Sequence, residues 1–521
     1  MSLINRIMTV GGFTLLSRIF GLARDFLMAR YLGAGMAADA FFIAFKLPNF
    51  FRRLFAEGAF STAFVPLFSR ALGKDITPES QAAAEAFAGR VFSWLLPVLL
   101  LLLLVMELAM VPVMLGLTGG FDDSTSEKFD LVVELGRHTF PYLVMISIVS
   151  FYAGMLNAVG RFGAAAFAPV LLNMCMILAL LLFNDTEIEA ARTLAGAVSI
   201  SGLAQMLLLY GSVKRAGLKL TLPKPRLSDD VRELLRVMAP AAIGAGIMQI
   251  NLLADVIIAA RLLPEGSVSW LFYADRLAQL PLGVIGIAAG TVLLPSISRL
   301  LAADDHEGAA QEQNRALEFT MLLTLPAAAA LATISLPLIA TIFERGAFTG
   351  MDTTATAAAL FAYAFGLPAY VIQKILTPGY FARKDTRTPV IYASLSLVVN
   401  LVLNLILIQY FAHVGLAIAT AIAAWLNVAL LYFGLRSRGY LAVQSSTSFS
   451  ILRQVAASAI MIGVLLAIQE TLTPYFAEDG MERIAALAAF VLVGAGVYFL
   501  LLAMLGGLKL GQIRLMLKRS N

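Results

Sequence analysis

The sequence predicts an all-α protein that crosses a membrane many times, and three observations lead to this fold class. Of its 521 residues, 60% are hydrophobic and only 14% are charged, whereas soluble domains carry roughly 25% charged residues. The apolar residues form continuous runs, for example Val91 to Met114, instead of the alternation of a membrane β-barrel. Because a span in lipid must satisfy its own backbone hydrogen bonds, these runs indicate transmembrane helices.

Segments of about 20 apolar residues are long enough to cross a bilayer, and we expect about fourteen of them. The first, second and eighth contain enough polar residues for a hydropathy profile alone to miss them. In chain order the expected cores are 8–30, 38–68, 90–116, 131–157, 166–184, 192–212, 236–262, 268–300, 317–343, 355–382, 389–410, 414–435, 450–471 and 483–506.

The charges of the connecting segments predict the orientation. Even-numbered connections are basic: segment 214–236 alone holds seven lysines and arginines. Odd-numbered connections, such as 122–127 and 185–189, lean acidic. By the positive-inside rule we expect both termini in the cytoplasm. This sorting accounts for the net charge of +5 without a nucleic-acid partner.

The chain also repeats itself. "ARYLGAG" at 29–35 matches "ARLLPEG" at 260–266, and "VPLFSRAL" at 65–72 matches "LPSISRLL" at 294–301. Six helices therefore repeat as six helices, and an even number of spans makes the two repeats parallel. The expected organisation is an N-lobe (1–217), a basic cytoplasmic linker (218–235), a C-lobe (236–439) and a C-terminal helix pair with a basic tail (440–521).

Charged side chains inside the first expected span are candidate functional residues. An ionisable residue at the centre of a membrane helix costs at least about 2.5–3.5 kcal/mol, so its presence needs a reason. Ser17 and Arg24 are seven residues apart, as are Arg18 and Asp25. Each pair therefore lies near one helix face.

The second and eighth spans carry similar residues. A polar face of the second span, at the helical period, consists of Asp39, Lys46, Arg53 and Glu57. Asn49 and Arg52 point further round that helix, which Pro48 should kink. In the eighth span Ser269 and Arg276 share a face, and in the repeat alignment Arg276 corresponds to Lys46.

These residues predict a central cationic cavity between two six-helix bundles, which is the plan of a transporter. Excess arginine in such a cavity favours an anionic, phosphate-bearing substrate, because guanidinium binds phosphate oxygens bidentately. A structural alternative holds for some of the charges. Arg53 and Glu57 can form a pair four residues apart, and Arg30 and Lys46 can reach the membrane interface.

A second set of polar residues lies in later spans. Asp255 is in the seventh, Asn400 and Asn404 are one turn apart in the eleventh, and Thr420 is in the twelfth. Oxygen ligands of this kind could hold Na⁺ or another coupling ion. Hydrogen bonding between helices is the alternative explanation. The sequence predicts no other cofactor.

Two segments resemble a known family. Residues 17–66, "SRIFGLARDFLMARYLGAGMAADAFFIAFKLPNFFRRLFAEGAFSTAFVP", and residues 266–298, "GSVSWLFYADRLAQLPLGVIGIAAGTVLLPSIS", are similar to the MurJ (MviN) lipid II flippases of bacteria. That family belongs to the multidrug/oligosaccharidyl-lipid/polysaccharide exporter superfamily. The resemblance extends over essentially the whole chain and implies fourteen helices, with the added C-terminal pair forming a groove for a polyprenyl tail.

The resemblance also implies a function and a site. The chain would be a transporter in the bacterial inner membrane, acting as a monomer among membrane lipids and possible cell-wall synthesis partners. It would move undecaprenyl-pyrophosphate-linked disaccharide-pentapeptide, lipid II, from the inner to the outer leaflet. Gln279 departs from the glutamate often found in close relatives, and we leave it out. The implied cavity residues are Ser17, Arg18, Arg24, Asp25, Asp39, Asn49, Arg52, Glu57, Ser269 and Arg276.

Other functions remain open at this point. A related exporter, either a polyprenyl-linked oligosaccharide flippase or a drug/cation antiporter, would share the fold, although cationic drugs favour an acidic or aromatic cavity. An enzyme acting on polyprenyl phosphates would need clustered acidic metal ligands, whereas the aspartate pairs here lie in separate loops. A scaffold without transport would not need the arginines. The sequence has no P-loop, and its single cysteine, Cys175, excludes a disulfide within the chain.

Overall fold

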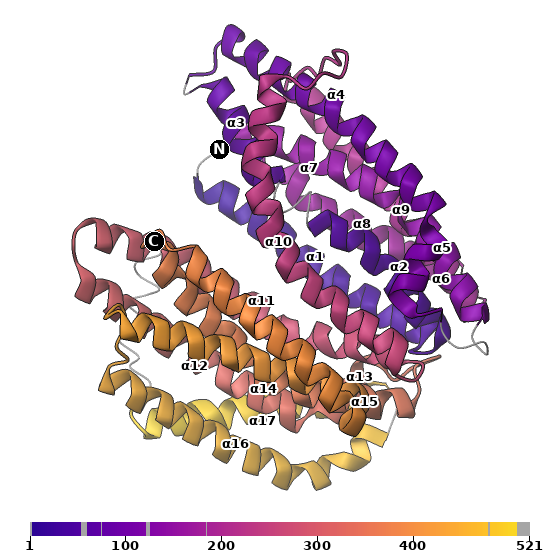
Figure 1. The fold of residues 1–521 in the computed structure, drawn as a ribbon. Coiled ribbons are helices and arrows are strands. Elements are labelled where there is room, and N and C mark those ends of the chain that lie inside the picture. The colour runs from indigo at the N-terminus through magenta and orange to yellow at the C-terminus, as the bar shows by residue number, and fades with distance from the viewer. Residues whose placement is uncertain are drawn as a thin grey trace. The chain divides into compact units, whose positions relative to one another are not determined.

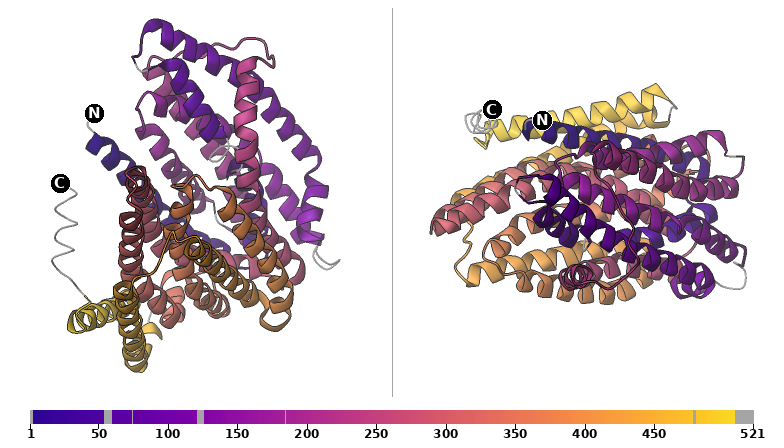
Figure 2. Two further views of the ribbon diagram at one scale, coloured as in Figure 1. Left: turned by 60° about the vertical axis from the view of Figure 1, so that its left-hand side comes forward. Right: turned by 90° about the horizontal axis from the view of Figure 1, so that it is seen from above.

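A computed structural model describes residues 3–53, 60–73, 75–120, 126–183, 185–477 and 480–507. Every regular element in these ranges is a helix, as Figures 1 and 2 show, and the all-α class is confirmed. The chain divides into two compact units. The first unit comprises Met1–Ser269 and Arg345–Thr349, and the second comprises Trp270–Glu344 and Gly350–Asn521.

The first unit is built from ten helices among its described residues. Within it α1 packs against α8, α8 and α7 pack against α9, and α2 packs against α6. The helices are α1 (Leu3–Leu32), α2 (Met36–Phe51), α3 (Phe60–Leu72), α4 (Pro78–Leu108), α5 (Met110–Thr118), α6 (Ser126–Thr139), α7 (Tyr142–Ala158), α8 (Gly163–Leu182), α9 (Glu187–Arg215) and α10 (Asp229–Leu262).

The second unit takes up the chain from Trp270, inside α11. Here α14 runs along α15, α12 packs against α14 and α16, and α16 pairs with α17. The helices are α11 (Ser267–Ala302), α12 (His306–Thr333), α13 (Ser335–Phe343), α14 (Gly350–Phe381), α15 (Arg387–Ser437), α16 (Ser445–Ala477) and α17 (Met481–Met504).

Each expected span coincides with one helix, half a helix or two consecutive helices. The element α15 covers both 389–410 and 414–435, and these two helices meet at a kink at Ala412, where φ is 47° and ψ is −130°. Three spans are instead interrupted, giving the pairs α4/α5, α6/α7 and α12/α13, while the residues between α2 and α3 lie mostly outside the described ranges. Hydropathy could not locate these breaks, because the residues at them, such as Ala109 and Ile334, are as apolar as their neighbours.

In the part of the chain that the structure describes, nine helical segments are long and apolar enough to cross a membrane. They include α4, α8, α9, α12 and α14 to α17, together with the segment Glu127–Ala158, which comprises α6 and α7. The polar first, second and eighth spans are outside this set, as the sequence predicted, and so is the seventh, α10, which the sequence did not predict. The multi-pass membrane fold is confirmed.

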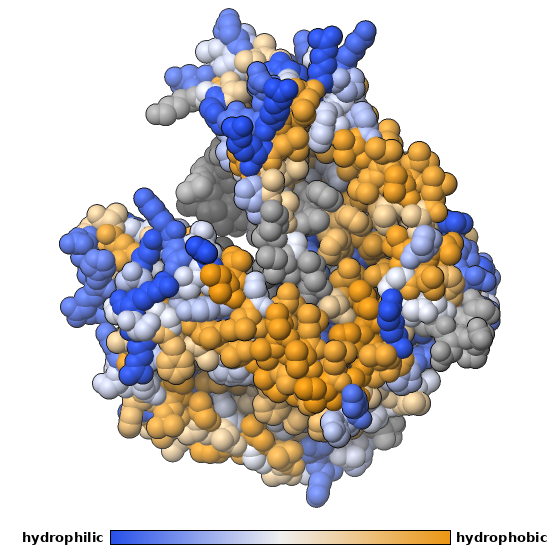
Figure 3. All heavy atoms as spheres, in the orientation of Figure 1, coloured by the Kyte–Doolittle hydropathy of each residue, from blue (hydrophilic) through white to orange (hydrophobic). Residues whose placement is uncertain are grey.

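Apolar side chains cover much of the face of the molecule that Figure 3 shows, where they are coloured orange. On α4, Leu101, Leu104 and Leu108 are exposed, and on α15 Val402 and Leu405 are exposed. Helices with such an outer surface are stable in hydrocarbon, where their backbone groups are already hydrogen-bonded internally.

The division into compact units does not follow the sequence repeat. The repeat groups residues 236–262 with the C-lobe, whereas α10 packs on α3, α4 and α5 of the first unit. Contact density and sequence repetition are different criteria, since a helix can pack away from the helices with which it was duplicated. The lobes therefore remain a prediction.

Candidate functional site

Asp39 is the centre of a buried polar cluster in the first unit. It lies in the first turn of α2 and is 2% exposed. Lys128 Nζ, from α6, donates to Asp39 Oδ2 at 3.0 Å, and the backbone N–H of Gly266 donates to the same oxygen at 2.8 Å. The backbone N–H and hydroxyl of Ser269 donate to Oδ1 at 3.0 and 2.7 Å. Four donors thus satisfy one buried carboxylate.

The geometry of this cluster follows from the start of α11. The first N–H groups of a helix have no partner within the helix and carry its positive dipole end. Asp39 supplies the missing acceptor from a different helix, as an N-cap side chain does locally. The sequence placed Asp39 and Ser269 in one cavity, and the structure brings them into direct contact. Lys128 was not identified from the sequence, although it is the one cation in an otherwise acidic segment, which could have marked it.

Arg24 and Asp25 form a second buried cluster, where α1 packs on α8. Their exposed fractions are 6% and 3%. Arg24 Nη2 lies 2.6 Å from Asp25 Oδ1, and Arg24 Nη1 donates to Asn173 Oδ1, on α8, at 2.9 Å. Asn173 Nδ2 in turn donates to the backbone carbonyl of Ser17 at 3.0 Å. Asn173 was missed because a single amide in an apolar run gives no charge signal.

The sequence put Ser17 and Arg24, seven residues apart, near one helix face but gave no sign of Asn173, the residue that contacts them both. Asp25 forms an ion pair with its neighbour Arg24. The side chains of Ser17 and Arg18 are half-buried.

The end of α2 carries the next predicted residues. Arg52 Nε donates to Asn49 Oδ1 at 3.1 Å, and Asn49 Nδ2 donates to the Phe45 carbonyl at 3.0 Å. Asn49 and Arg52 are half-buried, and Arg53 is exposed. Glu57 lies outside the described residues, so its expected pairing with Arg53 stays a prediction.

In the second unit, Arg276 occupies a partly buried position on α11. Its guanidinium carbon lies 5.0 Å from the ring centre of Phe272, one turn earlier on the same helix. This distance permits a cation–π interaction, which orients the guanidinium while keeping its charge. Gln279 donates to Asp275 on the same helix, which is a local role.

Three of the four proposed ion ligands lie together in the second unit. Asn400 Nδ2 donates to Thr420 Oγ1 at 3.3 Å, and Asn404 Nδ2 donates to Asn400 Oδ1 at 3.3 Å. Asn400 and Asn404 are 1% and 0% exposed. The contacts fit hydrogen bonding between the two halves of α15, and the neutral oxygens are also of the kind that Na⁺ accepts. Asp255 belongs to the first unit and is half-buried.

Metal sites of the His, Cys, Asp and Glu type have no candidate within the described ranges, where no group of three or more such side chains could hold an ion. The ion ligands predicted from the sequence are of another kind, namely one carboxylate, two amides and one hydroxyl.

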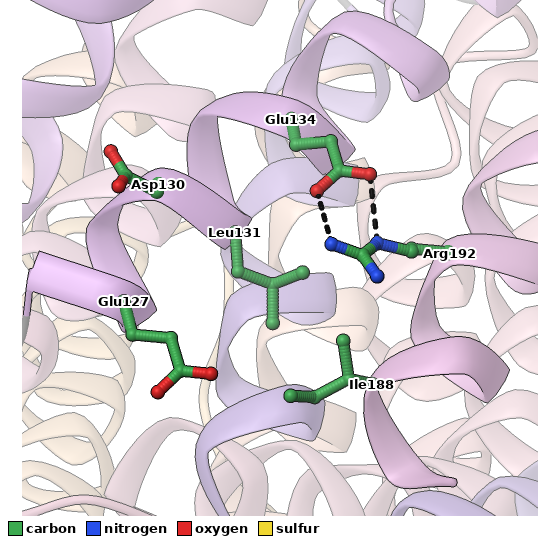
Figure 4. A pocket seen from close by; sticks show the side chains of 6 residues that line it. All are labelled: Glu127, Asp130, Leu131, Glu134, Ile188 and Arg192. Carbon is green, nitrogen blue, oxygen red and sulfur yellow. Dashed lines mark hydrogen bonds and ion pairs between the residues drawn. The ribbon is translucent and has the colours of Figure 1, made fainter.

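A pocket of about 340 Å³ opens between α6 and α9 in the first unit, as Figure 4 shows. Arg192 holds Glu134 through two contacts, with Nε to Oε1 at 2.8 Å and Nη2 to Oε2 at 2.9 Å. This pair neutralises one of three carboxylates, so the pocket stays acidic. It contains none of the predicted cavity residues. The lining residues are Glu127, Asp130, Leu131, Glu134, Ile188 and Arg192.

Comparison with known proteins places the whole chain beside one group. A family model described as lipid II flippase MurJ matches residues 28–486. A probable lipid II flippase MurJ of Rhizobium tropici is 42% identical over 528 residues, covering 100% of this chain and 98% of that protein. The corresponding protein of Rhizobium meliloti (strain 1021) is 43% identical, covering 100% of this chain and 97% of that protein.

Solved structures agree with the sequence relatives. A lipid II flippase MurJ in an inward closed conformation matches with a TM-score of 0.79 at 27% identity, covering 95% of this chain and 98% of that one. An inward-facing multidrug resistance MATE family transporter of the MOP superfamily matches with a TM-score of 0.67 at 17% identity, covering 83% and 97%. At that identity the second match shows a shared fold alone.

Proposed function

The chain belongs to the lipid II flippase MurJ family, and from this we propose that it moves lipid II from the cytoplasmic to the periplasmic leaflet by alternating access. The observation that carries the proposal is the match over the full length of the relatives. The function is transport, and the task of the cavity side chains is to bind a pyrophosphate-linked lipid.

We propose that the pyrophosphate is bound by arginines of α1, α2 and α11. Arg18, Arg52 and Arg276 would contact phosphate oxygens, because guanidinium binds them in a bidentate way. Arg24 would act in a fixed orientation, since Asp25 and Asn173 already hold its guanidinium. The remaining residues of the proposed cavity are Ser17, Asp25, Asp39, Asn49, Glu57 and Ser269.

Arg276 offers the sharpest test, because the Phe272 ring on the same helix orients its guanidinium without neutralising the charge. Arg276→Ala should weaken lipid II binding to the purified protein at least tenfold, and Arg276→Lys should recover part of it, since lysine keeps the charge without the fork. Native mass spectrometry measures the binding. Arg299→Ala, which removes an exposed arginine of the same helix, is the matched control.

Two results would contradict this assignment. Binding equal to wild type in Arg276→Ala would move the pyrophosphate elsewhere. The second test is a spheroplast leaflet assay of a variant with alanine at Arg18, Arg24, Arg52 and Arg276. If this variant still exported lipid II, the cationic cavity would have no part in transport.

We propose that the lobes have the boundaries given by the repeat, 1–217 and 236–439, and that both termini are cytoplasmic. The support is the basic character of the even-numbered connections. After Cys175→Ser removes the single native thiol, cysteines introduced at Ser446 and at Asp185 should label from opposite sides of the membrane. Labelling of both from one side would overturn the orientation.

We also propose that Asp255, Asn400, Asn404 and Thr420 bind Na⁺ as a coupling ion. The support is the proximity of the three neutral oxygen-bearing side chains. When bound, the ion would supply a charge that links the helices carrying these residues, with Asp255 providing the negative charge. Na⁺ should raise the unfolding temperature of wild type relative to K⁺ at equal ionic strength, and Asn404→Ala should abolish the difference. An equal response to both ions would reject the site.

A further inference from the structure

A polar pocket of about 350 Å³ lies in the second unit, where α12 and α16 begin and α17 ends. It contains none of the residues proposed above for lipid II or for Na⁺. Its charged lining residues are Arg315 and Glu318 of α12 and Arg453 of α16, and the hydroxyls of Ser446 and Thr447 complete one wall. A pocket of this volume is within the range of small-molecule sites.

The walls of this pocket are fixed by buried hydrogen bonds. Asn314, 2% exposed, donates through Nδ2 to the Ala442 carbonyl at 3.0 Å and accepts from the Gln444 N–H at 3.1 Å. Ser450 Oγ donates to Glu318 Oε1 at 2.6 Å. These contacts join α12 to the segment that enters α16, so the pocket is preorganised.

The pocket is positively charged overall, because two guanidinium groups face one carboxylate. Arg453 is held in place: its Nη1 donates to the Gly506 carbonyl at 3.3 Å, and its guanidinium carbon lies 4.8 Å from the Phe449 ring centre. Arg315 is exposed and makes no hydrogen bond or ion pair with any residue that the structure describes. Its donors are therefore available to an anion.

The surroundings of the pocket are apolar. Phe449, Leu452, Phe319 and Met504, from the three helices that line it, are 58%, 61%, 44% and 75% exposed. A free anion would gain nothing from these side chains. A molecule with a charged head and hydrocarbon chains would use both the pocket and its apolar rim.

We propose that this pocket binds the phosphodiester head group of an anionic phospholipid. Arg315 and Arg453 bind phosphate oxygens, the hydroxyls of Ser446 and Thr447 complete the contacts, and acyl chains lie along Phe449 and Leu452. The pocket thereby links α12, α16 and α17 to the surface of the bilayer. Basic pockets at the ends of membrane helices are suited to anionic head groups.

Arg315→Gln is the primary test, because the exposed side chain has no described contact whose loss could unfold the protein. Native mass spectrometry on the full chain would compare binding of phosphatidylglycerol with that of phosphatidylcholine. A charge-assisted hydrogen bond contributes about 1.5–3 kcal/mol, so Arg315→Gln should weaken phosphatidylglycerol binding about tenfold. Arg315→Gln combined with Arg453→Gln should remove the preference over phosphatidylcholine, and Arg315→Lys should retain part of it.

The matched control is Arg299→Gln combined with Arg436→Gln, which removes two exposed arginines of the same unit outside the pocket. This variant should bind phosphatidylglycerol within twofold of wild type. Lipid II binding by Arg315→Gln should equal wild type, which separates this proposal from the flippase mechanism.

Three results would overturn the proposal. One is equal phosphatidylglycerol binding by Arg315→Gln and wild type. Another is equal binding of the two phospholipids by wild type. The third is full displacement of phosphatidylglycerol by millimolar inorganic phosphate or glycerol phosphate, which would assign the pocket to a free anion.

Discussion

Removal of the Asp39 charge tests whether the buried cluster of α2, α6 and α11 holds the first unit together. In Asp39→Asn the side chain keeps its shape, but Lys128, whose side chain is 6% exposed, is left as a buried cation facing a neutral amide. Breaking one side of a buried ion pair costs about 3–5 kcal/mol. The amide nitrogen also replaces one of two oxygens that now accept two hydrogen bonds each.

Further variants can divide this loss of unfolding free energy among the individual contacts of Asp39. Ser269→Ala removes one neutral-donor hydrogen bond and should cost about 1 kcal/mol. Lys128→Met should cost about as much as Asp39→Asn, because Asp39 then remains charged and buried. The double variant Asp39→Asn/Lys128→Met should cost clearly less than the two single variants together, since it removes both charges of the Asp39–Lys128 ion pair.

The assay is equilibrium unfolding of the purified protein in detergent, with Asp130→Asn, which alters an exposed carboxylate of α6, as the control. Additive costs in the double variant would refute the reasoning, because they would show that the two charges do not interact. A cost below about 1 kcal/mol for Lys128→Met would refute it as well.

Two further predictions concern other parts of the chain. Hydrogen bonds from the N–H of Thr388 and, less strongly, from Arg438 lower the pKa of Asp385 to about 2. The ionised carboxylate therefore stabilises the fold above its unfolded pKa of about 3.9, and this stabilisation is lost as the pH falls toward 2. Asp385→Asn should accordingly reduce the change in melting temperature over this pH range. Gly33 has a φ of +64°, and a Cβ there would lie 2.5 Å from the Ala347 carbonyl oxygen. Gly33→Ala should therefore cost more in unfolding free energy than Gly217→Ala, where φ is +77° but the space is open and about 1–2 kcal/mol of backbone strain is expected.

The fold was predictable because hydrocarbon leaves few solutions for a polar backbone. Long apolar runs gave the helices, and the polar spans were found from their charges and from the repeat. The breaks within spans were not predictable, since residues such as Ala109 and Ile334 are ordinary helix residues whose local geometry depends on packing. The lobe boundary at 218–235 likewise rests on repetition alone, while the contacts of α10 depend on the tertiary structure.

The candidate site shows a similar limit at the level of single residues. Helical spacing put Ser17 and Arg24 near one face, because the period of a helix is fixed by its backbone, and in the structure the Ser17 carbonyl and the Arg24 guanidinium both contact Asn173. Spacing along one helix could not identify Asn173, which contacts both residues although it lies 149 positions after Arg24 in the sequence. A neutral amide in an apolar helix carries no charge that would mark it in a sequence, although as donor and acceptor together it can hold two groups at once. Intramembrane charges therefore reveal where polar chemistry is concentrated, while the residues that orient them are found only when the helices are packed.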